Sequence, residues 1–229
     1  MLGAVPGTLS LSEPGPLDSV MRLAVAGRLP RGQAVAALRA MAAALARRRR
    51  DEAAAVIKLD SWHVLALPLL REAFPGVPWV YLFREPVEVL VSHMRMRGYQ
   101  TVPSLMPEGL YRLDGLSAAE PERLCAALLA QFHSAALPAI EAGEGLAIDY
   151  ATLPDGADRI AAHFGLSLCE GARAGMMRVA SRDAKAQVRA FVPDAAAKRR
   201  EGNDAVRAAA AEWLAEPHQR LAACARRAG

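Results

Sequence analysis

The sequence predicts an α/β protein with a three-layer α/β/α arrangement around a central parallel sheet. Four short apolar runs, at residues 8–11, 54–59, 79–83 and 146–150, have the length of buried strands. Each run is followed by a stretch with helical periodicity, and such alternation is typical of βαβ units with a parallel sheet. The chain has 229 residues, 53% of them hydrophobic, and no repeat or linker divides it. We therefore expect residues 1–229 to form a single domain with one core.

The first predicted strand, at residues 8–11, ends in a polar turn that contains Glu13. Ligands of open α/β sheets bind at the carboxyl ends of the strands, which makes Glu13 a candidate site residue. Alternatively, Glu13 caps the helix that begins near Leu17. Residues 1–7 have the pattern of the last turn of a helix, so we expect that a segment is missing upstream.

The second predicted strand, at residues 54–59, follows a helix over 31–50 whose alanines and leucines indicate a structural role. Near its end the strand carries Lys58 and Asp60. A cation beside a carboxylate is suited to general-base chemistry, but the two residues equally suit a plain ion pair. Ser61 is the predicted N-cap of the next helix.

Residues 79–98 are predicted to form a strand, a tight turn and a helix. Pro86 suits the first helical turn. At about 100° per residue, Arg84 and Ser92 lie roughly 80° apart around the helix axis. They can therefore converge on one anion at the strand end. The alternative is that Arg84 pairs with Glu88 and that Ser92 is a solvated hydroxyl.

The second half of the chain alternates irregular and helical stretches. Residues 99–117 are rich in Pro, Gly and Met and are expected to form a long loop or a lid over the ligand edge. A long helix begins at Pro121, and Pro138 is expected to kink or end it. We expect the last helix over residues 203–215.

Two further features lie near the ends of these elements. Tyr150 follows the last predicted strand and either shapes the site or packs at the edge of the core. Residues 178–200 form a basic, broken segment that contains Lys198. Its positive charge suits an anionic ligand.

Composition narrows the function classes. The chain has 28 Lys and Arg residues and 24 Asp and Glu residues, so its net charge is +4. This mild positive charge suits the binding of a small anionic ligand better than the binding of nucleic acid. Cys125, Cys169 and Cys224 are far apart with no CxxC pair, so we expect reduced thiols and no metal site. No apolar run approaches a membrane span and no signal peptide is visible, which predicts a cytoplasmic protein without a membrane partner.

Together these residues resemble the sulfotransferase family, whose members transfer a sulfuryl group from 3'-phosphoadenosine 5'-phosphosulfate (PAPS). The family's 3'-phosphate motif, R-x-P-(x)5-S at the start of a helix after a strand, is matched by Arg84, Pro86 and Ser92. The resemblance covers most of residues 8–165. It implies a P-loop NTPase-like sulfotransferase fold, PAPS as donor without a metal, and a 3'-phosphate held by Arg84 and Ser92. Lys198 is implied as a further phosphate contact.

The resemblance also implies catalytic roles. The cytosolic branch carries K-T-H at a strand end, and IKLDSWH is similar, with Lys58 as the lysine and Asp60 in place of the catalytic histidine. Tyrosylprotein and heparan sulfotransferases use a glutamate after an early strand, so Glu13 is the rival base. Lys58 would steady the leaving phosphate while Asp60 or Glu13 takes a proton from a hydroxyl or amine of a small-molecule or peptide acceptor.

One feature of the family is missing from these residues. Sulfotransferases hold the 5'-phosphosulfate in an S-G-[ST]-[ST] turn, and neither this turn nor the Walker pattern GxxxxGK[ST] occurs in the sequence. We therefore expect an N-terminally shortened copy whose transfer activity is in question. The alternatives are a non-catalytic nucleotide-binding or scaffold protein with the same fold, and another P-loop transferase such as a small-molecule kinase. The missing Walker lysine disfavours the kinase.

Overall fold

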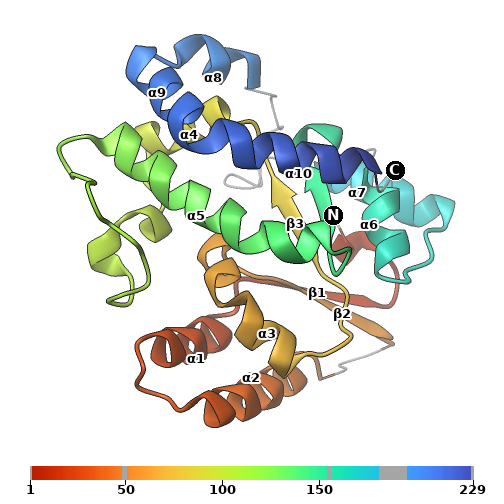
Figure 1. The fold of residues 1–229 in the computed structure, drawn as a ribbon. Helices are drawn as coiled ribbons and strands as arrows, with labels where there is room; N and C mark the ends of the chain where they lie inside the picture. Colours follow the sequence, from red (N-terminus) through yellow and green to blue (C-terminus); the bar gives the residue numbers. More distant parts are fainter. Residues whose placement is uncertain (1, 48–50, 154–155, 181–194, 228–229) are drawn as a thin grey trace.

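The computed structural model describes residues 2–47, 51–153, 156–180 and 195–227. It shows a mixed α/β protein that is mostly helical (Figure 1). The described strands are β1 (Thr8–Ser12), β2 (Ala54–Lys58), β3 (Val80–Phe83) and β4 (Leu146–Asp149). The α/β class and the four predicted strands are thus confirmed, and each strand differs from its predicted range by one residue at one end.

The strands pair in parallel, as the βαβ order predicts. β1 pairs with β2, and β3 pairs with β4. Among the described residues these pairs form two separate two-stranded sheets, and no ladder joins them into one central sheet. The predicted single central sheet is therefore not observed in the described part of the chain. The alternation of strands and helices predicts parallel pairing, but it does not determine which strand edges meet.

The register of each pair sets which residues share a strand end. Ser12 lies opposite Lys58 at the carboxyl end of β1 and β2, and Phe83 lies opposite Asp149 at the carboxyl end of β3 and β4. Residues that directly follow β1 and β2 therefore meet at one edge. Those that follow β3 and β4 meet at another edge, so the candidate residues fall into two groups.

Ten α-helices lie within the described residues. They are α1 (Gly15–Val25), α2 (Arg31–Leu45), α3 (Leu67–Ala73), α4 (Pro86–Arg95), α5 (Pro121–Glu141), α6 (Ala157–His163), α7 (Glu170–Ala180), α8 (Ala195–Glu201), α9 (Asp204–Ala209) and α10 (Ala215–Arg227). A π-helical turn (Ala210–Leu214) joins α9 to α10. The last helical stretch therefore runs well past the predicted end at residue 215, because an apolar stripe with Leu214 and Leu221 continues into the core.

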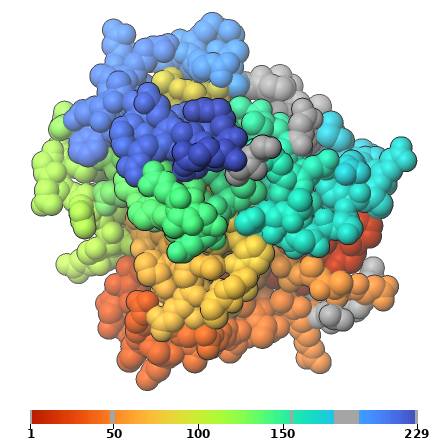
Figure 2. Space-filling model, turned by 45° about the vertical axis from the view of Figure 1, so that its right-hand side comes forward, coloured from red at the N-terminus to blue at the C-terminus, as the bar shows by residue number. Residues whose placement is uncertain are grey.

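The centre of the core is α5, which packs beside α10 (Figures 1 and 2). Both faces of α5 are largely buried, and the helix continues through Pro138 to Glu141. Of the two predicted outcomes at Pro138, an end of the helix there is wrong, because the buried contacts on either side outweigh the one missing backbone hydrogen bond. By length and composition α5 is apolar enough to cross a membrane, contrary to our expectation, but 61% of that window is buried as in a core helix.

The helix after β2 begins differently from the prediction. It opens with a 3-10 turn, η2 (Ser61–Ala66), which leads into α3. Asp60 rather than Ser61 caps this turn, since its carboxylate accepts a hydrogen bond from the Trp62 backbone N–H at 3.4 Å. The capping places the Asp60 side chain at the carboxyl end of β2, where the first candidate site lies.

Candidate functional site

Glu13 and Lys58 meet at the carboxyl end of the first sheet. The Glu13 backbone N–H donates to the Lys58 carbonyl at 2.7 Å, and the Lys58 ammonium group pairs with the Glu13 carboxylate. Glu13 has a φ of 48°, in the left-handed region that non-glycine residues rarely adopt. The alternative that Glu13 caps α1 is wrong, because Pro14 holds the N-cap position without a side-chain hydrogen bond.

Asp60 is bonded to the loop that was expected to form a lid. The Tyr99 hydroxyl donates to Asp60 Oδ2 at 2.9 Å. Tyr99 belongs to the short 3-10 turn η3 (Tyr99–Thr101), one of two such turns in the predicted loop; the other is η4 (Pro103–Leu105). The plain ion pair between Lys58 and Asp60 is not formed, since Lys58 pairs with Glu13 instead.

Asp18 on α1 is the centre of a polar network beside Asp60. Its carboxylate binds Arg22 Nε at 2.7 Å, Trp62 Nε1 at 3.1 Å and His63 Nε2 at 3.0 Å. Arg22 Cζ lies 5.5 Å from the ring centroid of Trp62 and 5.5 Å from that of Tyr99. We call the following group the Asp18 cluster: Asp18, Arg22, Asp60, Trp62, His63 and Tyr99.

Burial and hydrogen bonds set the charges of this cluster. Burial raises the pKa of Asp18, but hydrogen bonds from Arg22 and His63 outweigh it and leave the pKa below its usual value. Burial lowers the pKa of His63, so the imidazole is neutral at pH 7. Its single N–H then belongs on Nε2, facing the Asp18 carboxylate, and Nδ1 is left as a buried acceptor without a hydrogen-bond partner in the described part of the chain.

The second sheet ends in a basic group. Arg84 Nε donates to Glu88 Oε2 at 2.7 Å, and Arg199 of α8 pairs with the other carboxylate oxygen, Oε1. Arg84 Cζ also lies 5.1 Å from the ring centroid of Tyr150. We call these four residues, Arg84, Glu88, Tyr150 and Arg199, the Glu88 cluster. The alternative in which Arg84 pairs with Glu88 is thus observed.

The remaining predicted phosphate ligands lie beside this cluster rather than in it. Ser92 is half-buried on α4, and within the described ranges no hydrogen bond joins it to Arg84. Lys198 is buried on α8, whereas the neighbouring Arg199 reaches Glu88. Of the predicted basic segment, residues 181–194 lie outside the described residues.

Several residues of these clusters were not predicted as site residues. The spacing of Asp18 and Arg22, four residues apart on a helix that follows a strand end, is a signal that could have indicated a pair. The approach of Arg199 to Glu88 has no such signal, because 111 residues separate them. His63 and Tyr99 are likewise brought to the site only by the tertiary fold.

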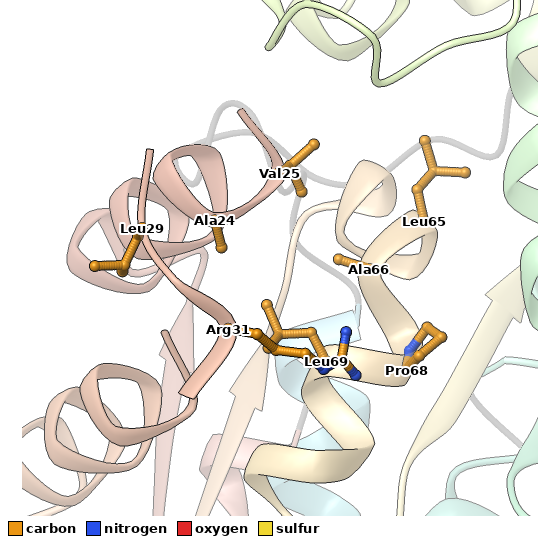
Figure 3. A pocket seen from close by; sticks show the side chains of 8 residues that line it. All are labelled: Ala24, Val25, Leu29, Arg31, Leu65, Ala66, Pro68 and Leu69. Carbon is orange, nitrogen blue, oxygen red and sulfur yellow. The ribbon is translucent and has the colours of Figure 1, made fainter. Parts of the chain in front are cut away.

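Two cavities lie away from both clusters. One, of about 260 Å³, is an apolar hollow between the end of α1 and the η2–α3 stretch, with Arg31 on its wall (Figure 3). The other, of about 300 Å³, lies at the amino end of β1, next to Asp51 and Glu52. No predicted site residue lines either cavity, so the candidate site rests on the two clusters.

The two clusters differ in the chemistry they support. Paired guanidinium groups at the start of a helix suit a phosphate or sulfate group, and a carboxylate beside aromatic rings suits a hydroxyl or amine.

Within the described ranges no group of three or more His, Cys, Asp or Glu side chains is placed to hold a metal ion. Comparisons with protein-family models, with curated proteins and with solved structures gave no match for this chain.

Proposed function

We propose that this chain binds the adenosine nucleotide of the PAPS class and acts as a sulfotransferase-like protein. The observation that carries the proposal is the meeting of Arg84 and Arg199, from segments far apart in the chain, on the one buried carboxylate of Glu88. Guanidinium groups bind phosphate through paired, charge-assisted hydrogen bonds. The site also lies at the N-terminus of α4, whose dipole favours an anion.

The fold expectation belongs to this proposal. Each described strand is parallel to its partner and leads into a helix, as in a three-layer P-loop NTPase-like sulfotransferase fold. In that arrangement the 3'-phosphate lies against Arg84, with Ser92 and the α8 residues Lys198 and Arg199 nearby. The nucleotide then extends along the strand ends toward Lys58.

The proposed reaction moves a sulfuryl group to a hydroxyl or amine. The acceptor atom forms a bond to sulfur while the bond from sulfur to the 5'-phosphate oxygen breaks, and adenosine 3',5'-bisphosphate leaves. The acceptor proton passes to a carboxylate, and Lys58 steadies the charge on the leaving phosphate. We favour Asp60 over Glu13 as the base because Asp60 already accepts a hydrogen bond from a hydroxyl, that of Tyr99.

Binding of adenosine 3',5'-bisphosphate by two arginine variants tests the proposal. Arg84→Ala removes a charge-assisted contact worth about 1.5–3 kcal/mol, so we expect binding at least about tenfold weaker in calorimetric titration. Arg95→Ala is the matched control, because Arg95 lies at the other end of α4 and likewise pairs with a carboxylate, that of Glu201 on α8. Equal loss, or no loss, in the two variants would overturn the assignment.

A second candidate is a non-catalytic nucleotide-binding or scaffold protein, favoured by the missing S-G-[ST]-[ST] turn. It predicts tight binding of adenosine 3',5'-bisphosphate with no transfer from PAPS to any acceptor. Thermal-shift measurements with ATP as the competing nucleotide test the kinase alternative, which predicts stabilisation by ATP but not by the bisphosphate.

A further inference from the structure

The Tyr99 side chain occupies a position that suits a small aromatic molecule with a hydroxyl group. Its hydroxyl donates to Asp60 Oδ2 at 2.9 Å, and one face of its ring is covered by Arg22 at 5.5 Å. The residue is 39% exposed, so the ring rests against the surface rather than in the core. Both contacts would be available to any phenol in its place.

The groups that hold the Tyr99 ring are fixed without it. Arg22 is held by the Asp18 carboxylate at 2.7 Å, by the Leu105 carbonyl at 3.0 Å and by the face of the Trp62 ring. Asp60 accepts the N-cap hydrogen bond of η2 from the Trp62 backbone N–H. The guanidinium plane and the carboxylate are therefore pre-organised, which lowers the cost of binding a ligand between them.

The rest of the loop is anchored separately from the Tyr99 ring. Thr101 is completely buried, and its hydroxyl donates to the Gly98 carbonyl at 2.9 Å. Met106 is also buried and receives an Arg22 contact at its sulfur, at 3.6 Å. The Tyr99 ring can thus leave its position while the buried anchors of the loop remain in place.

We propose that the position between Arg22 and Asp60 is a binding site for an aromatic hydroxyl compound and that Tyr99 is an internal occupant that closes it. The ring of the ligand stacks on Arg22 while its hydroxyl donates to Asp60. This inference rests on the proposed function, in which it names a phenol as the acceptor class. As an acceptor, the phenol oxygen bonds to the sulfur of PAPS, the bisphosphate leaves and Asp60 takes the proton.

Tyr150 provides a matched control for this site. It is 41% exposed and also stacks on an arginine, with Arg84 Cζ at 5.1 Å. Its hydroxyl makes no hydrogen bond to a carboxylate in the described part of the structure. Removing the Tyr150 ring therefore opens a place beside a guanidinium group without the acceptor that a phenol needs.

Fluorine NMR with 4-fluorophenol, and with fluorobenzene as the ligand without a hydroxyl, tests the proposal in the absence of nucleotide. Tyr99→Ala is expected to bind 4-fluorophenol about tenfold more tightly than the unmodified chain does, because the internal occupant is gone. It should bind fluorobenzene about tenfold more weakly than 4-fluorophenol. Tyr150→Ala should bind 4-fluorophenol as weakly as the unmodified chain does in these nucleotide-free titrations.

Asp60→Ala combined with Tyr99→Ala tests the acceptor directly, since the double variant has no side-chain oxygen at residue 60 and is expected to lose the preference for 4-fluorophenol. Thermal unfolding checks that each variant folds, and Tyr99→Ser replaces Tyr99→Ala if the alanine variant does not. Equal binding of the two ligands by the Tyr99 variant, or no binding, would overturn the proposal. Because no nucleotide is present, the result is independent of whether Arg84 binds adenosine 3',5'-bisphosphate.

Discussion

The two strand-end clusters use the same parts but bury different groups, since the Asp18 side chain is 25% exposed and the Glu88 side chain 5%. In each, an arginine stacks on a tyrosine and pairs with a carboxylate. In the Asp18 cluster the donors Trp62 and His63 are buried around the carboxylate. In the Glu88 cluster the carboxylate is 5% exposed, while the side chains of Arg84 and Arg199 are 27% and 52% exposed.

This difference fits a structural role for the Asp18 cluster and the nucleotide-binding role that we propose for the Glu88 cluster. In the Asp18 cluster the buried N–H groups of Trp62 and His63 donate to the Asp18 carboxylate, so the network stabilises the junction of α1 and η2. In the Glu88 cluster the Arg199 side chain is 52% exposed, so under the proposed function a phosphate can approach its guanidinium group. The exposed edge of the Asp18 cluster, at Tyr99 and Asp60, is the part where we propose that a ligand can replace the Tyr99 ring.

The largest expected effect comes from removing the two carboxylates. Asp18→Ala leaves the buried N–H groups of Trp62 and His63 without their acceptor, at about 1–3 kcal/mol each, so we expect a total loss of about 3 kcal/mol in the free energy of unfolding. Glu88→Ala should cost about 1 kcal/mol, because its exposed arginines turn to water. Urea denaturation of both variants measures the free energy of unfolding. Equal losses of that free energy would contradict a structural role for the Asp18 cluster alone.

A smaller effect is expected from the two tyrosine hydroxyls. Tyr99→Phe removes the hydrogen bond to Asp60 but keeps the ring on Arg22, and should cost about 1 kcal/mol of stability. Tyr150→Phe should change stability by less than about 0.5 kcal/mol. Hydrogen exchange of residues 97–106 should rise in the first variant alone. Unchanged exchange in Tyr99→Phe would show that the hydroxyl does not hold the loop.

The sequence predicted those parts of the structure that depend on neighbouring residues. The four strands follow from short apolar runs, and the pairing of Arg84 with Glu88 follows from their separation of four residues across the start of α4. The burial of α5 follows from its apolar faces, although its continuation past Pro138 does not. These features are local, so periodicity and spacing are sufficient to find them.

The parts that were not predicted depend on contacts between distant segments. His63 and Asp18 are 45 residues apart, and Arg199 and Glu88 are 111 apart, so no spacing rule relates them. The division of the strands into two sheets likewise depends on which edges meet in space. For the same reason Asp60 was recognised as a candidate while its partner, Tyr99, was assigned only to a loop.

The smallest expected effect is an acid sensitivity of the Asp18 cluster. Burial lowers the pKa of His63 below its value of 6.5 in the unfolded chain. As the pH falls through about 6.5, His63 therefore binds a proton in the unfolded chain before it does so in the folded chain. Between about pH 6.5 and the lowered pKa of the folded chain, the protein loses the stability that neutral His63 provides at higher pH. Urea denaturation at about pH 7 and about pH 5.5 measures the loss.

His63→Gln keeps an N–H for Asp18 but cannot take up the proton, so its loss of stability between the two pH values should be smaller than that of the unmodified chain. His133, whose pKa burial lowers to about 4, is present in both chains and cancels in the comparison. Tyr150→Phe, altered in the other cluster, should follow the unmodified chain at both pH values. Parallel losses in His63→Gln and the unmodified chain would place the acid sensitivity outside the Asp18 cluster.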